Sequence, residues 1–168
     1  MERHLRVPFL LARHCERMHP PLAALVQNTS HLHQNGSAMT LAYACVLIAA
    51  FLPYVWTVIA KRSGGGRFDN RDPRQWLEKQ ENPRSRRADA AQKNAFEAFP
   101  AFAAGVLMAQ QAGVDPRTIG WLGVVFVVSR VLHGMFYIGN RASMRSLVWF
   151  VGFACVVALL VMAVLRIA

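Results

Sequence analysis

Two uninterrupted uncharged runs, Leu41–Ala60 and Leu147–Leu165, dominate the pattern of hydrophobic and polar positions along the chain. An α-helix rises about 1.5 Å per residue, so each run is long enough to cross a hydrocarbon core of about 30 Å. Two further stretches, Asn94–Ala112 and Ile119–Gly139, have a similar length but hold a few polar side chains. The pattern therefore predicts four membrane-spanning helices, at about residues 41–60, 92–112, 119–139 and 147–166.

Composition supports a lipid environment for these helices. Hydrophobic residues make up 54% of the 168 residues, charged residues only 17%, and the mean hydropathy is +0.25. An ordinary soluble domain of this size is less apolar and more highly charged. The expected fold class is therefore all-α, an integral membrane four-helix bundle.

The formal net charge of +10 predicts a topology rather than a nucleic-acid partner. Most basic residues fall within residues 61–93, where acidic residues are mixed among them, and no nucleic-acid-binding motif occurs. The connection after the third span holds two more arginines, whereas the connection after the second holds only Arg117. By the positive-inside rule, the loops at 61–90 and 140–146 face the cytoplasm of a multi-pass protein. The chain is short and lacks eukaryotic retention signals, which favours a bacterial inner membrane.

The segment 1–38 does not follow the pattern of the rest. It is basic, carries five of the six histidines and three prolines, and its longest apolar stretch is too short for a signal-peptide core. Because Met39 directly precedes the first span, we hypothesise that translation starts there and that residues 1–38 are disordered or not made. The alternative is a real, flexible extension. The transmembrane domain would then comprise residues 39–168.

Polar side chains within and beside the predicted spans share one depth in the membrane. Ionisable groups there cost several kcal/mol, about 2.5–3.5 on insertion scales, so they tend to face the interior of a bundle and serve a site. Arg130, His133 and Tyr137 on the third span are spaced i, i+3, i+7 and so lie on one helix face. Helix direction places all six in the cytoplasmic leaflet: Asn94, Glu97, Arg130, His133, Tyr137 and Arg145. We expect a cytoplasm-facing pocket between helices.

This pocket would combine carboxylate and amide groups with guanidinium, imidazole and phenol groups, which suits a peptide-like ligand carrying an ammonium and carboxylates. The alternative is structural: Glu97 would pair with Arg130, and His133 and Tyr137 would form interhelical hydrogen bonds.

The small residues and the cysteines are assigned no catalytic or binding role. Ala101, Gly105 and Ala109 form a stripe on the second span that would allow close approach of another helix. We expect the second span to lie at the axis of a trimer. Three cysteines without paired spacing predict neither a disulfide framework nor a metal site.

Several motifs on the predicted helices resemble the family of membrane-associated proteins in eicosanoid and glutathione metabolism, called MAPEG. Asn94-Ala95-Phe96-Glu97-Ala98-Phe99-Pro100 is similar to the N-x-x-E-x-x-P signature of that family. Arg130-x-x-His133-x-x-x-Tyr137, followed by Arg145-Ser146, resembles its microsomal prostaglandin E synthase and microsomal glutathione transferase members. Arg62 and the stretch 68–70 resemble the end of the first helix and the loop that follows it in the prostaglandin E synthase member. The resemblance runs from about Ala42 to the C-terminus.

The resemblance implies a homotrimer that binds one glutathione at each subunit boundary, near the cytoplasmic face. Family members transfer glutathione to lipophilic electrophiles, reduce lipid hydroperoxides or isomerise an endoperoxide, and one is a lipid-binding scaffold without catalysis. The chain departs from the family at Ala90, a position that is usually basic. Arg87 lies one turn earlier and could substitute, and Lys93 matches a basic position beside the asparagine.

Each candidate residue has an expected role in this site. Glutathione reacts as its thiolate, which Arg145 would stabilise at the start of the fourth helix, with Ser146 donating a hydrogen bond to the sulfur. Glu97 would face the ammonium or an amide of the tripeptide. Its carboxylates and carbonyls would be held by the remaining candidates: Arg62, Asn94, Arg130, His133, Tyr137, Lys93 and Arg87.

Two functions from different classes stay open. The first is a glutathione-dependent transferase or peroxidase acting on lipophilic electrophiles or hydroperoxides, and the second is a non-catalytic membrane protein, either a lipid-binding scaffold or a structural bundle. A proton or ion pathway is a third reading. The pathway is disfavoured because the polar groups cluster in one leaflet rather than lining a route across.

Overall fold

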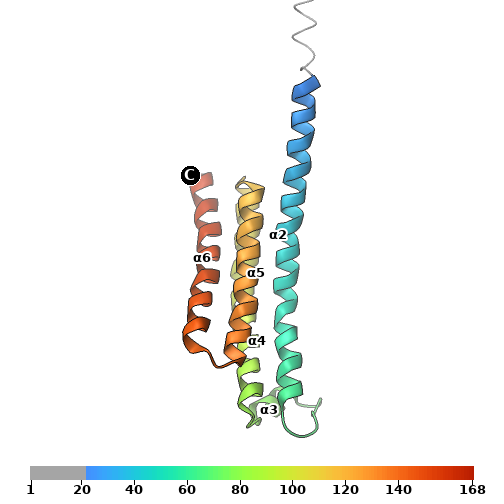
Figure 1. The fold of residues 1–168 in the computed structure, drawn as a ribbon, viewed down its shortest axis with the longest axis vertical. Helices are drawn as coiled ribbons and strands as arrows, with labels where there is room; N and C mark the ends of the chain where they lie inside the picture. The colour runs from blue at the N-terminus through green and yellow to red at the C-terminus, as the bar shows by residue number, and fades with distance from the viewer. Residues whose placement is uncertain (1–21) are drawn as a thin grey trace, which may run out of the picture. The chain divides into compact units, whose positions relative to one another are not determined.

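The computed structural model describes residues 22–168, with side chains from residue 36 onward. This part contains five helices and no strand (Figure 1): α2 (Leu22–Ser63), α3 (Pro73–Glu78), α4 (Pro83–Gln111), α5 (Pro116–Ile138) and α6 (Ala142–Ile167). Contacts divide the chain into Met1–Ser37 and Ala38–Ala168, and only the second unit is described below. The expectations for residues 1–21 lie outside the described residues, and translation from Met39 stays a prediction.

An Asp or Asn followed by proline begins three of the helices. The side chains of Asp72, Asn82 and Asp115 accept hydrogen bonds from backbone N–H groups of the first turn, at 3.2, 2.9 and 2.9 Å. Such caps satisfy N–H groups that have no partner within the helix, and proline after them has a fixed φ suited to the first helical position. The cap at Asn82 explains why α4 begins at Pro83, earlier than the second span predicted at about residues 92–112.

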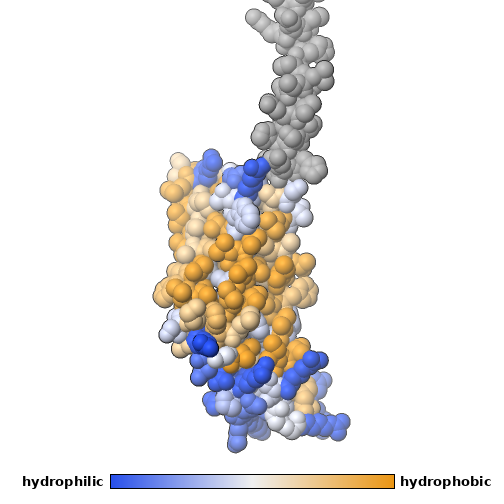
Figure 2. Space-filling view, in the orientation of Figure 1, coloured by the Kyte–Doolittle hydropathy of each residue, from blue (hydrophilic) through white to orange (hydrophobic). Residues whose placement is uncertain are grey.

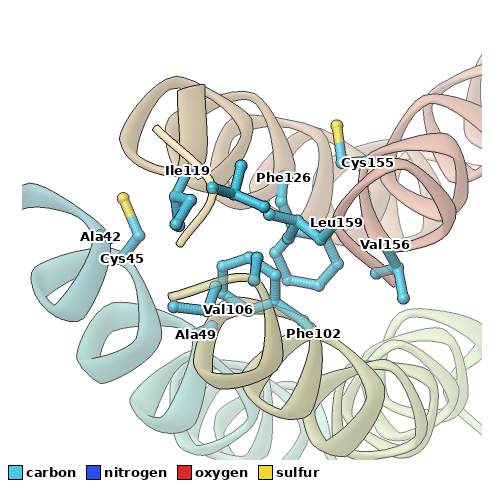
Figure 3. Close-up of a cluster of buried hydrophobic side chains, with 12 residues drawn as sticks. Ala42, Cys45, Ala49, Phe102, Val106, Ile119, Phe126, Cys155, Val156 and Leu159 are labelled. Atoms are coloured by element: carbon cyan, nitrogen blue, oxygen red, sulfur yellow. The ribbon is translucent and has the colours of Figure 1, made fainter. Parts of the chain in front are cut away.

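Helices α4, α5 and α6 run side by side around an apolar core that also receives side chains of α2 (Figure 3). At its centre, the rings of Phe102 on α4 and Phe126 on α5 stack with centroids 3.9 Å apart and planes 10° apart. Leu159 of α6 is fully buried against this pair. Burial of large side chains from several helices at one point fixes the register of the helices relative to one another.

Glycines allow α2 to approach α5 closely. A Cβ on Gly123 would lie 3.2 Å from Cβ of Cys45, and a Cβ on Gly134 would overlap the indole of Trp56. The hydroxyl of Ser85 on α4 donates a hydrogen bond of 2.7 Å to the carbonyl oxygen of Ala60, at the end of α2. These contacts hold α2 against both α4 and α5.

The stripe of small residues on α4 allows close approach of a helix, as predicted, and the helix that it meets is α6 of the same chain. A place for α4 at the axis of an oligomer stays a prediction. Gly105 and Ala109 are buried, and a Cβ on Gly105 would lie 3.2 Å from Cβ of Leu159 on α6. Only Ala101 is exposed. The stripe therefore brings α4 close to α6 within one chain, because a glycine at this point removes the side chain that would separate the two helices.

Three described helices are long and apolar enough to cross a membrane, at Gly36–Ser63, Pro116–Ile138 and Ala142–Ile167. The fourth predicted span, on α4, does not reach the same apolarity, because Asn94 and Glu97 interrupt it and its first turns are charged. On the face shown in Figure 2, hydrophobic side chains cover most of the coloured part between its two ends, and hydrophilic ones gather mainly at the end that holds α3 and the first turns of α4. An exposed apolar surface of this extent marks a membrane protein.

Candidate functional site

A buried arginine on α5 forms a hydrogen bond with α4 at the centre of the polar side chains that the sequence predicts to form a pocket. Arg130 and His133 of α5 are 4% and 3% exposed. The Arg130 guanidinium donates a hydrogen bond to the side-chain oxygen of Asn94 on α4, and its Nη2 lies 3.4 Å from Nδ1 of His133. Its Nε is buried without a partner among the described residues. The Arg130 guanidinium is therefore not fully satisfied by the described residues.

Aromatic contacts extend the cluster from α5 to α6. The rings of His133 and Tyr137 meet edge to face, with centroids 5.7 Å apart, and the guanidinium carbon of Arg145 lies 4.3 Å from the centroid of the Tyr137 ring. The spacing i, i+3, i+7 thus places three side chains of α5 on one face, as the sequence predicts. Their role in binding stays a prediction.

Glu97 is connected to this cluster through an amide rather than through an ion pair. The Asn94 side chain donates a hydrogen bond of 3.4 Å to the carboxylate of Glu97 while it accepts one from Arg130. Between residues 36 and 168, the ion pairs do not include Glu97 with Arg130, so the structural alternative in which these two side chains pair directly is not observed. Glu97 is also exposed on this chain rather than buried. Its carboxylate is available to a ligand.

Two adjoining pockets lie between α4, α5 and α6 beside these groups. The first, of about 360 Å³, is lined by Asn94, His133, Tyr137, Arg145, Ser146, Trp149 and Phe150. The second, of about 230 Å³, is lined by Asn94, Glu97, Ala98, Ala101, Phe126, Arg130, Trp149, Gly152, Phe153 and Val156. We call the first the polar pocket, because it is the more polar of the two and most of its lining residues are polar, and the second the apolar pocket. They share Asn94 and Trp149, so a ligand in one would lie next to a ligand in the other.

The aromatic wall of these pockets was not predicted from the sequence. The rings of Trp149 and Phe153 on α6 stack with centroids 5.2 Å apart and planes 8° apart. They follow Arg145 at i+4 and i+8, which places all three on one helix face. That spacing could have identified them, but apolar side chains in a membrane-spanning run carry no distinguishing signal of their own.

Arg145 and Ser146 line the polar pocket, but Arg145 does not open α6. The helix begins at Ala142, and the backbone N–H of Arg145 donates to the carbonyl oxygen of Arg141 at 3.0 Å. The free N–H groups of the first turn therefore belong to the residues before it, and no side chain caps them. Arg145 contributes its side chain alone.

The other three candidate residues do not join the cluster in this chain. Arg87 donates a hydrogen bond of 3.0 Å from Nε to the carbonyl oxygen of Ile138, at the end of α5. Lys93 forms an ion pair of 2.9 Å with Asp89. Arg62 is exposed and lines neither pocket. In this chain Arg87 satisfies a carbonyl at a helix end, and its substitution for a basic residue at position 90 stays a prediction.

Sequence similarity to known proteins identifies the family of this chain. No individual curated protein matches the chain. The model of the MAPEG family matches residues 41–165. This range covers most of the chain, including nearly all of the three helices that can cross a membrane and every residue that lines the two pockets. The chain therefore belongs to the MAPEG family.

Proposed function

We propose that this protein is an integral, multi-pass membrane enzyme in which α4 also crosses the membrane. It uses glutathione to attack lipophilic electrophiles or to reduce lipophilic hydroperoxides. One observation carries the proposal: a polar pocket holding a guanidinium and a hydroxyl directly adjoins an apolar pocket, with Trp149 as their common wall.

The polar groups suit the ends of a tripeptide with one ammonium and two carboxylates. The exposed carboxylate of Glu97 would accept hydrogen bonds from the ammonium. The guanidinium of Arg130, which lines the apolar pocket, would bind carboxylate or carbonyl oxygens together with His133 and Tyr137, which line the polar one. Hydrogen bonds between charged groups are stronger than neutral ones, which favours a charged peptide over a neutral ligand.

The chemical step would take place where the two pockets meet. Arg145 would stabilise the glutathione thiolate, and Ser146 would donate a hydrogen bond to the sulfur. The sulfur attacks an electrophilic carbon in the apolar pocket, and the leaving group departs with the electron pair of the broken bond. With a hydroperoxide, the sulfur attacks the terminal oxygen, giving an alcohol and a glutathione sulfenic acid. A second glutathione converts that product to the disulfide and water.

A homotrimer is part of the proposal, because Arg62 lies away from the pockets of its own chain. If Arg62 contributes to a site, a neighbouring subunit must supply it. Co-expression of Arg62→Ala and Arg145→Leu chains tests this, since random mixing in a cyclic trimer rebuilds about one quarter of the sites. Activity above that of either variant alone supports shared sites, and its absence contradicts them.

Equilibrium binding of glutathione to the detergent-purified protein, followed by turnover with a lipophilic aryl halide and with an organic peroxide, tests the function. Binding and turnover are expected. The second candidate is a non-catalytic lipid-binding scaffold, which Ala90 and the use of Arg87 at a helix end favour, since they leave fewer cations for glutathione. Binding of a lipophilic ligand without glutathione-dependent turnover would establish the scaffold instead.

A further inference from the structure

A third pocket lies between α2, α3 and α4, and it shares no lining residue with the two pockets of the candidate site. Its volume is about 490 Å³. Thr57 and Lys61 line it from the last turns of α2, where the membrane-spanning stretch Gly36–Ser63 ends. Arg74 and Leu77 line it from the short helix α3. The pocket therefore lies at the level expected for lipid headgroups, at the end of the protein that we assign to the cytoplasm.

Charged groups of both signs line this pocket. Lys93 and Asp89 neutralise each other at 2.9 Å, which leaves the charges on α2 and α3. The ammonium of Lys61 lies 4.2 Å from the centroid of the Phe68 ring. Arg74 and Glu78 sit on α3, and both side chains are exposed. Two cations and one carboxylate thus remain for a ligand.

An unpartnered acceptor in the same pocket points to the ligand. Gln92 lines it, and the side-chain oxygen of Gln92 is buried without a hydrogen-bond donor in the described part of the chain. A buried acceptor left without a donor costs free energy, so a turn of the Gln92 side chain toward a ligand that supplies an N–H group would be favoured. Phe96 and Leu77 give the pocket an apolar part next to these polar groups.

We propose that this pocket binds the headgroup of a phospholipid with a primary amine, of the phosphatidylethanolamine class. The phosphate would lie against Lys61 and Arg74, and the ammonium would donate hydrogen bonds to Glu78 and Gln92. The acyl chains would follow the apolar side of the pocket at Phe96. A purely anionic headgroup would face the Glu78 carboxylate without a compensating charge. A choline headgroup has the right charge but no N–H to donate.

Native mass spectrometry of the full-length protein with equal amounts of phosphatidylethanolamine, phosphatidylcholine and phosphatidylglycerol of matched acyl chains tests the proposal. The wild type should retain the primary-amine lipid about tenfold more than the choline lipid, equivalent to about 1.4 kcal/mol at 25 °C. Glu78→Gln and Gln92→Leu should each reduce this preference. The matched control Glu81→Gln, at an exposed position outside the pocket, should retain it.

Other outcomes would overturn the proposal. These are equal retention of the amine and choline lipids, stronger retention of the anionic lipid, or an equal loss of preference in the control variant. Soluble glycerophosphoethanolamine that binds as tightly as the lipid would identify a soluble ligand instead. Glutathione binding should not change in Glu78→Gln, because the pockets share no residue, so this proposal and the proposed function can fail independently.

Discussion

Replacing Arg145 by leucine tests whether its guanidinium stabilises a bound thiolate. The side chain is half-buried and packs 4.3 Å from the centroid of the Tyr137 ring, so it has a defined position beside the polar pocket. At about 4 Å from a thiolate and an effective dielectric constant of about 20, the attraction is about 4 kcal/mol. Because the side chain is partly open to solvent, which screens the interaction, we take about half of that value, about 2 kcal/mol.

This free energy sets the expected loss of activity. A free cysteine thiol has a pKa of about 8.5, so about 3% is ionised at pH 7. A stabilisation of about 2 kcal/mol lowers that pKa by about 1.5 and raises the ionised fraction to about one half. Arg145→Leu should therefore lower turnover at pH 7 about 15-fold, with a smaller effect on binding of the thiol form. The deficit should shrink above pH 9, where the thiol ionises without help. Arg145→Lys should give an intermediate loss, because it keeps the charge but not the fork.

The assay combines the ultraviolet absorbance of the thiolate, measured when glutathione is added at pH 7, with turnover of a lipophilic aryl halide across the pH range. Arg141→Leu is the matched control, since Arg141 is exposed, lies one turn earlier at the start of α6 and lines neither pocket. The reasoning is refuted if Arg145→Leu behaves like Arg141→Leu, or if its deficit is the same at pH 7 and pH 9.

Four further substitutions test the polar cluster, the packing of α2 and one helix cap. Asn94→Ala leaves the buried Arg130 guanidinium without its acceptor and should destabilise the fold by about 1–3 kcal/mol, whereas Glu97→Gln, at an exposed position, should weaken glutathione binding with little change in melting temperature. Equal melting temperatures of the two variants would contradict this. Gly134→Ala places a methyl group on the indole of α2 and should lower stability by about 1–3 kcal/mol, measured by denaturation in detergent; unchanged stability would show that α2 does not pack there. Hydrogen bonds from the backbone N–H and hydroxyl three residues later hold the pKa of Asp115 below its usual value of 3.8. The charged form therefore stabilises the fold above that pH, and the excess melting temperature of the wild type over Asp115→Asn should be present at pH 7 and disappear as the pH falls below 3.8; a pH-independent difference would contradict a charged cap.

Much of the architecture can be read directly from the sequence. The uncharged runs predict α2 and α6, because a long stretch without charges has few stable states other than a membrane-spanning helix. The spacing of Arg130, His133 and Tyr137 predicts their common face, because helical periodicity is a local property. Asp or Asn before proline also marks the starts of α3, α4 and α5. The four predicted spans rest on hydropathy alone, and hydropathy does not detect these caps.

The sequence alone therefore located the four long helices, though not where α2 and α4 begin, together with the polar groups on each face, and hence the family resemblance. Only the tertiary structure decided which face meets which neighbour: that Asn94 stands between Glu97 and Arg130, that Arg87 caps α5, and that Gly105 packs on α6. Periodicity shows which residues share a face, but not what that face contacts. In a membrane protein, apolar side chains face both the lipid and the interior, so hydropathy cannot identify the buried face, and packing alone decides it.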